Sequence, residues 1–380
     1  MILAYLSLFA MGYLDNSRGP AYPLILKDLN LTPAMGSWFF SLSSLAGLIV
    51  YLTAKHWLPV LGVVRGTKLS LLIMALGTFA MGVLPELPYQ YFFLLFFSMI
   101  FGIGQGLSTY CMNLLVAEAS SPEVRSRAFS ALHSCYGVAS FVAPLVFSFF
   151  LNWQNNWSSF YLVMSALPLV VWVMVFKVGR GVKHEQKEAI QSGLSFLQRI
   201  PYGGVFSFYV ASEIVISSRL VYFLTEGRQF SSDDASKCLS LFFLSLMAGR
   251  MLFAFLPMRG KSYYAMILSL ILTIITFFLG YYFNPWFLGL LGGTMSFYFP
   301  MGMDWLTSNF EKGREQMIGS TMTQVGFLLI VMHIFFGKLA SMVGVEKALL
   351  MCPILTSISL VFLLVLGRKS SSDDRPLRPL

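Results

Sequence analysis

The sequence predicts an all-α membrane protein in which twelve transmembrane helices form two six-helix bundles, with both termini in the cytoplasm. Of its 380 residues, 57% are hydrophobic and only 11% are charged, and the mean hydropathy is +0.72. This composition excludes an ordinary soluble protein. The apolar residues gather in blocks of about 18 to 25 residues, which is the length of helix that crosses a bilayer.

Twelve such blocks follow one another along the chain. Their approximate bounds are residues 2–26, 36–54, 68–84, 91–116, 128–151, 159–176, 203–224, 237–256, 263–282, 286–307, 316–336 and 348–366. The longest hydrophilic stretch separates the sixth block from the seventh. We therefore expect bundles at residues 1–176 and 200–367, a cytoplasmic linker at 177–199 and a cytoplasmic tail at 368–380.

The basic residues lie mostly on one side of these blocks. If the N-terminus is cytoplasmic, eighteen Lys and Arg residues fall on the cytoplasmic side, five fall on the opposite side and three lie within blocks. The positive-inside rule then places both termini in the cytoplasm. The formal charge of +9 is therefore interpreted as a topology signal, and we expect no nucleic-acid partner.

The first block carries three polar side chains near its middle, Asp15, Asn16 and Arg18. Charged groups at this depth are costly and usually face a water-filled cavity or a transport path. Gly19 and the prolines that follow are expected to break the helix, which is tolerated only where the chain lines protein or a cavity. The alternative, a signal peptide at residues 1–14 followed by a loop, lacks a basic n-region and an A-x-A cleavage site.

The two halves of the chain show weak internal similarity. RSRAFSALHSCYG, which begins at Arg125, aligns with REQMIGSTMTQVG, which begins at Arg314, and the Ser-Arg pair that ends at Arg18 corresponds to the pair that ends at Arg219. With six blocks in each half, these matches indicate two parallel repeats related by an axis along the membrane normal.

Small residues inside the blocks are interpreted as packing residues. Gly102 and Gly106 have the GxxxG spacing of closely packed helices. The four cysteines all fall within apolar blocks and have no metal-ligand spacing. We therefore expect neither a disulfide nor a zinc site nor any other cofactor.

At these residues the chain resembles the major facilitator superfamily over essentially its whole length. The motifs that carry the resemblance are GYLDNSRGPAYP in the first block, SPEVRSRAFSALHSCYGVASFVAPL entering the fifth, and FYVASEIVISSRLVYFLTE with LSLFFLSLMAGR in the seventh and eighth. The acid of the first block and the YVxxE of the seventh are most similar to the fucose-permease-like branch of sugar and proton symporters. Two features depart from that pattern: LPVLGVVRGTK, between the second and third blocks, lacks the usual acid, and Gln105 and Asn113 replace an acid in the fourth.

The resemblance implies that the first, fourth, seventh and tenth helices line a central cavity. The residues expected to contact a solute are Asp15, Asn16, Arg18, Gln105, Asn113, Tyr136, Tyr209, Arg219, Tyr298 and Gln324. The arginines expected to act in gating are Arg125, Arg127, Arg250 and Arg314.

Proton coupling needs a carboxyl group whose pKa rises toward neutrality when it is dehydrated. Asp15, Glu213 and Asp304 have this chemistry. Arg18 lies three residues after Asp15 on the same helical face, so Asp15 is either a proton carrier or the structural counter-ion of Arg18. Glu213 is six residues from Arg219 and on a different face, so we expect Glu213 to titrate more freely.

A second hypothesis uses the two arginines at equivalent positions of the repeats. Arg18 and Arg219, facing each other across the cavity, would clamp a phosphate or a carboxylate. Members of the superfamily that exchange organic phosphates have a similar pair, although three acids offset it here. His133 and His333 are interpreted as hydrogen-bonded packing residues.

We therefore expect a secondary active transporter that moves a small, polar, sugar-like solute together with protons by alternating access. The alternatives are an organic-anion exchanger that uses Arg18 and Arg219, and an efflux carrier for drugs or amphiphiles. An intramembrane enzyme would need a nucleophile-base pair or a metal motif, which the sequence lacks. The expected partners are the solute, protons and the lipid bilayer, and we expect a monomer in a bacterial inner membrane.

Overall fold

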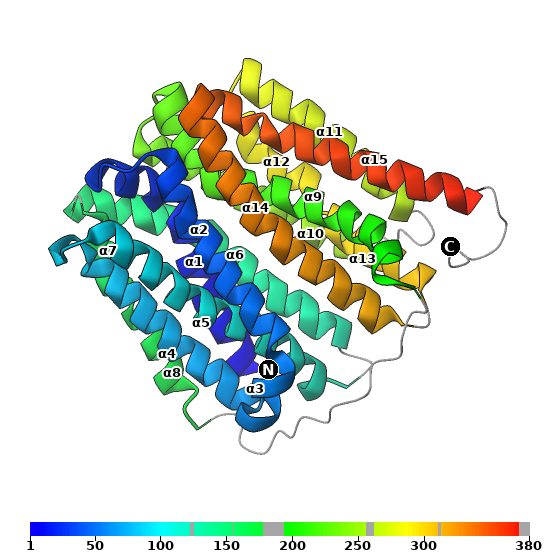
Figure 1. Ribbon diagram of the computed structural model, residues 1–380, viewed down its shortest axis with the longest axis horizontal. Helices are drawn as coiled ribbons and strands as arrows, with labels where there is room; N and C mark the ends of the chain where they lie inside the picture. The colour runs from blue at the N-terminus through cyan, green and yellow to red at the C-terminus, as the bar shows by residue number, and fades with distance from the viewer. Residues whose placement is uncertain (122–124, 155, 178–193, 256–261, 311–312, 372–380) are drawn as a thin grey trace.

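The computed structural model describes residues 1–121, 125–154, 156–177, 194–255, 262–310 and 313–371, and every regular element in these ranges is a helix. Most of the predicted linker and most of the predicted tail lie outside the described residues. Figure 1 shows two groups of helices side by side, one coloured from blue to green and the other from green to red.

The first group runs from α1 to α8 and the second from α9 to α15. The elements of the first are α1 (Ile2–Asp28), α2 (Pro33–Leu52), α3 (Ala54–Leu61), α4 (Val63–Gly82), η1 (Leu84–Glu86), α5 (Gln90–Ala119), α6 (Arg125–Gln154), α7 (Trp157–Met164) and α8 (Ala166–Met174). The elements of the second are α9 (Phe196–Tyr222), η2 (Phe223–Gly227), α10 (Ser232–Phe255), α11 (Ser262–Tyr282), α12 (Phe287–Met295), α13 (Tyr298–Asn309), α14 (Arg314–Leu349) and α15 (Met351–Ser371).

Nine helices within the described ranges are long and apolar enough to cross a membrane. The all-α membrane fold predicted from the sequence is therefore confirmed. The number of twelve spans and the cytoplasmic position of both termini stay predictions.

Two of the predicted blocks are divided in the structure, each just before a proline. The sixth block splits into α7 and α8 at Ser165, and the tenth splits into α12 and α13 after Met295. A proline ring clashes with the carbonyl group four residues earlier. Pro168 and Pro300 therefore account for both breaks.

The break predicted after Gly19 is wrong, because α1 is continuous from Ile2 to Asp28 and contains Pro20 and Pro23. Each proline removes only one helical hydrogen bond, and neighbouring helices stabilise such a segment inside a membrane protein. α1 packs against α6, α9 and α5. The polar residues of this helix consequently keep regular angular spacing.

Each group of helices has its own apolar core. Buried hydrophobic residues form one cluster within residues 3–175 and another within residues 205–366. The two groups meet mainly where α2 packs on α14, α6 on α10 and α1 on α9. Side chains on α1, α2, α9 and α14 can therefore reach the boundary between the halves.

The GxxxG prediction is confirmed by the packing of α5 on α2. A Cβ atom on Gly102 would collide with the backbone of Ser43, and one on Gly106 would lie 2.7 Å from the Cα of Gly47. The two backbones can approach this closely only because both positions lack a side chain. The approach places Gln105 of α5 next to α2.

The halves are in contact at the end of the molecule that carries the α1–α2 turn. There the backbone N–H of Ala34 donates to Ser341 Oγ over 2.9 Å, which joins α2 to α14. Ser148 Oγ donates to Asp233 Oδ1 over 2.8 Å, which joins α6 to α10. Near the other end of α14, by contrast, a Cβ atom on Gly319 would meet nothing within 4 Å.

Candidate functional site

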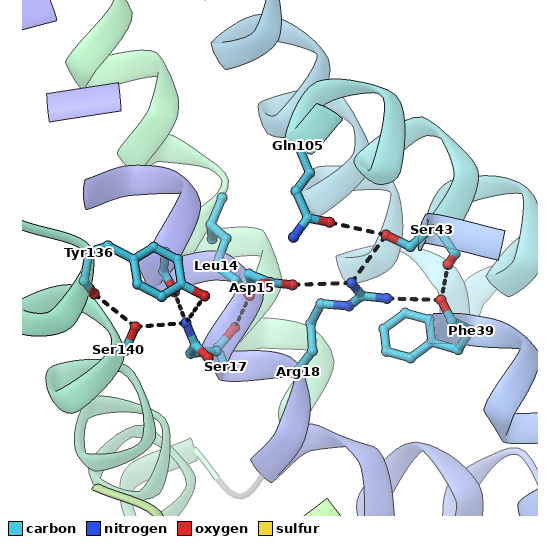
Figure 2. A network of polar contacts seen from close by, with 12 residues as sticks. Leu14, Asp15, Ser17, Arg18, Phe39, Ser43, Gln105, Tyr136 and Ser140 are labelled. Carbon is cyan, nitrogen blue, oxygen red and sulfur yellow. Dashed lines mark hydrogen bonds and ion pairs between the residues drawn. The ribbon is translucent and has the colours of Figure 1, made fainter. Parts of the chain in front are cut away.

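The guanidinium group of Arg18 is held by three helices (Figure 2). Asp15, one turn earlier on α1, forms an ion pair with it, and Oδ1 lies 3.3 Å from Nη1. Nη1 also donates to Ser43 Oγ over 3.2 Å, and Nη2 donates to the carbonyl oxygen of Phe39 over 2.8 Å, both on α2. Ser43 donates to Gln105 Oε1 on α5 over 3.5 Å. The predicted residues Asp15, Arg18 and Gln105 therefore share one network.

Aromatic rings enclose the same guanidinium. Arg18 Cζ lies 4.3, 4.8 and 5.2 Å from the ring centroids of Phe39, Phe40 and Phe101. A cation over a ring face is attracted by the ring quadrupole. The side chain of Arg18 is 6% exposed and that of Asp15 is 24% exposed. The structure supports the second interpretation of Asp15, in which it is the counter-ion of Arg18.

Asn16, also on α1, forms its contacts with α6. Its Nδ2 lies 2.8 Å from the carbonyl oxygen of Gly12, 3.1 Å from Tyr136 Oη and 2.8 Å from Ser140 Oγ. The ring of Tyr136 lies so close to Gly12 that a Cβ atom there would be 2.7 Å from the ring. Asn16 and Tyr136, both predicted from the sequence, are thus brought together in an uncharged polar cluster.

Arg219 lies in the second half of the molecule, near the end of α9, and is fully buried. Its Cζ lies 4.3, 4.1 and 5.3 Å from the ring centroids of Tyr22, Phe40 and Phe336. Its Nη2 lies 3.4 Å from both Ser37 Oγ and His333 Nδ1.

No acid neutralises Arg219 within the described part of the chain. Its Nε and Nη1 have no hydrogen-bond partner, and none of the ion pairs among the described residues includes it. The three aromatic rings lower the free-energy cost of burying the guanidinium but carry no net negative charge. Among the described residues, Arg219 is consequently a buried cation without an acidic counter-ion.

The two arginines of the repeats meet around one ring. Phe40 belongs to α2, yet its ring centroid lies 4.8 Å from Arg18 Cζ and 4.1 Å from Arg219 Cζ. His333 stacks on the same ring at 5.2 Å between centroids. The predicted pair is therefore close in space, but both guanidinium groups are buried against aromatic rings instead of facing each other across open space.

A third cluster surrounds Glu213 on α9. Its Oε1 lies 3.3 Å from Arg250 Nη2 on α10, and its Oε2 lies 2.7 Å from the hydroxyl of Tyr209. Tyr209 also lies 2.6 Å from the carbonyl oxygen of Met295, where α12 ends, and its ring stacks on Tyr298 at 4.0 Å. From the sequence, we considered only Arg219 as a cation near Glu213. In the structure, Arg250 is the cationic partner of Glu213.

The other predicted residues lie apart from these clusters. Asp304 is exposed on α13 and accepts a hydrogen bond from Ser262 Oγ over 2.5 Å. Asn113 donates to the carbonyl oxygen of Thr109 on its own helix over 2.8 Å. Gln324 contacts the first turns of α9. The side chains of three predicted gating arginines lie outside the described residues: Arg125, Arg127 and Arg314.

Sequence reasoning missed the residues that join the two arginines. Phe40 and Ser37 look like ordinary members of an apolar helix, and nothing in their spacing marks them. His333 was recognised, but only as a packing residue. Its contact with Arg219 depends on how α14 is rotated against α9, which no local pattern contains.

The chain belongs to the major facilitator superfamily, because the model of that family matches residues 4–224. Together with the nine apolar helices, this membership identifies an integral, multi-pass membrane protein. The narrower assignment to a fucose-permease-like branch stays a prediction.

Individual similarities are more distant. The niacin transporter NiaP of Acinetobacter baylyi is 28% identical over 160 residues, which is 42% of this chain and 35% of the relative. The bypass of stop codon protein 6 of Saccharomyces cerevisiae is 22% identical over 289 residues, 68% of this chain and 57% of the relative. The chain thus spans between about a third and somewhat over half of the length of these curated relatives.

One solved structure with the same fold is a bacterial homologue of the human lysosomal transporter Spinster in an inward-facing, occupied conformation. It superposes with a TM-score of 0.75 over 100% of this chain and 98% of that one. The identity is 13%, so the similarity concerns the fold alone.

Proposed function

We propose that this protein is a secondary active transporter that carries a small organic anion across the membrane by alternating access. The observation that supports the proposal is the buried guanidinium of Arg219, which has no acid beside it among the described residues. An uncompensated charge inside a membrane protein is costly and usually marks a functional site. A transported anion would supply the missing charge.

The remaining charges support a substrate with a single negative charge. Asp15 offsets Arg18, and Glu213 offsets Arg250. Among the described charges near the boundary between the halves, Arg219 then leaves one positive charge. A carboxylate matches this charge and accepts the two-pronged hydrogen bonds that a guanidinium offers.

The similarity to a niacin transporter agrees with this chemistry, since niacin carries a carboxylate. The aromatic surroundings of Arg219 also suit a substrate with a flat, partly apolar body. We therefore take nicotinate as the first probe of the substrate class, with benzoate and inorganic phosphate as further anions.

Alternating access provides a route to this buried site. The contacts of Ala34 with Ser341 and of Ser148 with Asp233 hold the halves together at the end near Arg219. If the termini are cytoplasmic, this is the outer end, and its separation would uncover Arg219 to the outside. In the state closed at this end, three aromatic rings pack against Arg219 where the anion would bind. This packing would favour release of the anion on the inner side.

A proton-coupled carrier of a sugar-like solute is the second candidate. The cluster of Asn16, Tyr136 and Ser140 favours it, because uncharged donors and acceptors suit hydroxyl groups. The pairing of Asp15 and Glu213 with arginines argues against free carboxyls as proton carriers.

Counterflow in proteoliposomes distinguishes the two candidates. Vesicles that contain the purified protein are preloaded with one unlabelled solute, and uptake of the same labelled solute is measured at equal pH on both sides. We expect exchange of at least one of nicotinate, benzoate and inorganic phosphate, and none of fucose. Exchange of fucose without any of the three anions would contradict the proposal.

A further inference from the structure

His333 is the titratable side chain in direct contact with the unneutralised arginine. It is 3% exposed, its Nδ1 lies 3.4 Å from Arg219 Nη2, and its ring stacks on Phe40 with 24° between the planes. A guanidinium can only donate hydrogen bonds. Nδ1 must therefore be the acceptor in this contact, which requires a neutral imidazole with its proton on Nε2.

The other charged or titratable groups on the elements packed against α14 do not offer His333 a negative charge. α9 contributes Arg219 and Glu213, and Glu213 is paired with Arg250. α2 has no charged residue, and its ionisable side chain is that of Tyr51, about three turns beyond Phe40. The carboxylates of Glu226 on η2 and Asp304 on α13 are exposed, and Asp304 is bound to Ser262. On α14 itself, Glu346 pairs with Arg228.

Two further groups on α1 complete these surroundings. Arg18, which shares the Phe40 ring, is already paired with Asp15. Tyr22 contributes a ring to Arg219. In the absence of an anion, His333 thus meets only cations and neutral groups among the described side chains.

We infer that His333 takes up the proton that travels with the anion, so that one proton moves with each monovalent anion. This inference rests on the function proposed above and names its coupling residue. An anion bound to Arg219 draws the guanidinium hydrogen bonds away from Nδ1 and places a negative charge beside the imidazole. Both changes favour the imidazolium form.

The coupling is reciprocal. A proton on Nδ1 provides a second cation for the anion, so proton binding strengthens anion binding by the same factor as anion binding strengthens proton binding. The proton passes from water on one side to Nδ1, and from Nδ1 to water on the other side after the halves rearrange. A monovalent anion then crosses with no net charge.

The test compares two transport modes in His333→Gln, with His56→Gln as the matched control. His56 is exposed on α3, away from the arginines. For the wild-type protein we expect an inward gradient of one pH unit to drive about 10-fold accumulation of an anion that it exchanges. His333→Gln should lose this accumulation and should show counterflow at equal pH only at a higher anion concentration, because it lacks the second cation, while His56→Gln should keep both transport modes unchanged.

Proton uptake by the purified wild-type protein gives a second readout that needs no variant. Binding of nicotinate or benzoate, whose carboxylates are fully ionised near pH 7, should be accompanied in a weakly buffered solution by uptake of close to one proton per bound anion. Gradient-driven accumulation by His333→Gln, or anion binding without proton uptake, would overturn the inference and leave the anion transport intact. Absence of counterflow with all three anions in the wild-type protein would instead contradict the proposed function.

Discussion

Arg18 and Arg219 occupy equivalent places in the two halves of the sequence, but their surroundings differ in one charge. Arg18 has Asp15 one turn away, two hydrogen-bond acceptors on α2 and three aromatic rings. Arg219 has three rings, a hydroxyl and a histidine, without an acid among the described residues. Arg18 is thus neutralised by Asp15, whereas Arg219 has the positive charge that the proposed anion would neutralise.

This difference predicts opposite effects of the same substitution on stability. Arg219→Met removes an unpaired buried cation and should stabilise the ligand-free protein by about 1 kcal/mol or more. Arg18→Met leaves Asp15 without its cation and should destabilise the protein by about 1–3 kcal/mol, less than for a fully buried pair because Asp15 is partly exposed.

Thermal unfolding of the purified proteins in one detergent measures both effects. The unfolding temperature should rise for Arg219→Met and fall for Arg18→Met. A fall of similar size in both variants would mean that Arg219 is balanced by groups outside the described residues.

At the scale of the helices, the sequence predicted most elements but few of their mutual contacts. Apolar blocks locate α2, α4, α5 and α11 well, because burial in lipid imposes a composition on the whole segment. Prolines were harder to interpret: α1 continues through Pro20 and Pro23, whereas the tenth block breaks before Pro300. Whether a proline breaks a helix depends on what its neighbours provide, and that is not a local property.

The same limit applies to the candidate site. Asp15 with Arg18 could be predicted from a spacing of three residues on one helix. The pair of Glu213 with Arg250 joins helices whose relative rotation no local pattern records. Phe40, which contacts both repeat arginines, carries no chemical signal of its own in the sequence.

The close packing of α5 on α2 makes a prediction about two glycines on long helices. Gly102→Ala should destabilise the protein by about 1–3 kcal/mol, because the new methyl group collides with the backbone of Ser43. Gly319→Ala should be neutral or stabilising by up to about 1 kcal/mol, because the space there is open and alanine favours helix.

Urea- or heat-induced unfolding of the two variants in detergent measures the contrast. Equal stability of Gly102→Ala and Gly319→Ala would contradict the close approach of the two helices. Because Ser43 also binds Arg18, we expect Gly102→Ala to lower anion counterflow as well.

At the scale of the whole molecule, two separately packed halves meet mainly along three helix pairs, and the hydrogen bonds between them include two at one end. Such an arrangement lets the halves rock without disturbing either core. Arg219 contacts Ser37, Tyr22 and Phe40 of the other half, so the proposed rocking would change its exposure. In the proposed mechanism, the charge of Arg219 would therefore be coupled to the rocking of the two halves.

Fixing the closed end should stop transport. The variant Ser148→Cys with Asp233→Cys places two thiols where an oxygen-to-oxygen distance of 2.8 Å joins α6 to α10. A short bifunctional thiol reagent should abolish counterflow in this double variant and leave each single variant active. Full counterflow after complete cross-linking would show that this end does not open during transport.

The most direct test of the account is the affinity of Arg219→Gln for the exchanged anion, measured by counterflow and compared with Lys338→Gln. Lys338 is an exposed cation on α14, so its loss changes the total charge equally without touching the site. We predict about 10- to 100-fold weaker anion binding in Arg219→Gln, the value of a charged hydrogen bond of about 1.5–3 kcal/mol, and an unchanged affinity in Lys338→Gln. Equal affinity in Arg219→Gln and the wild-type protein would contradict the claim that this buried arginine holds the anion.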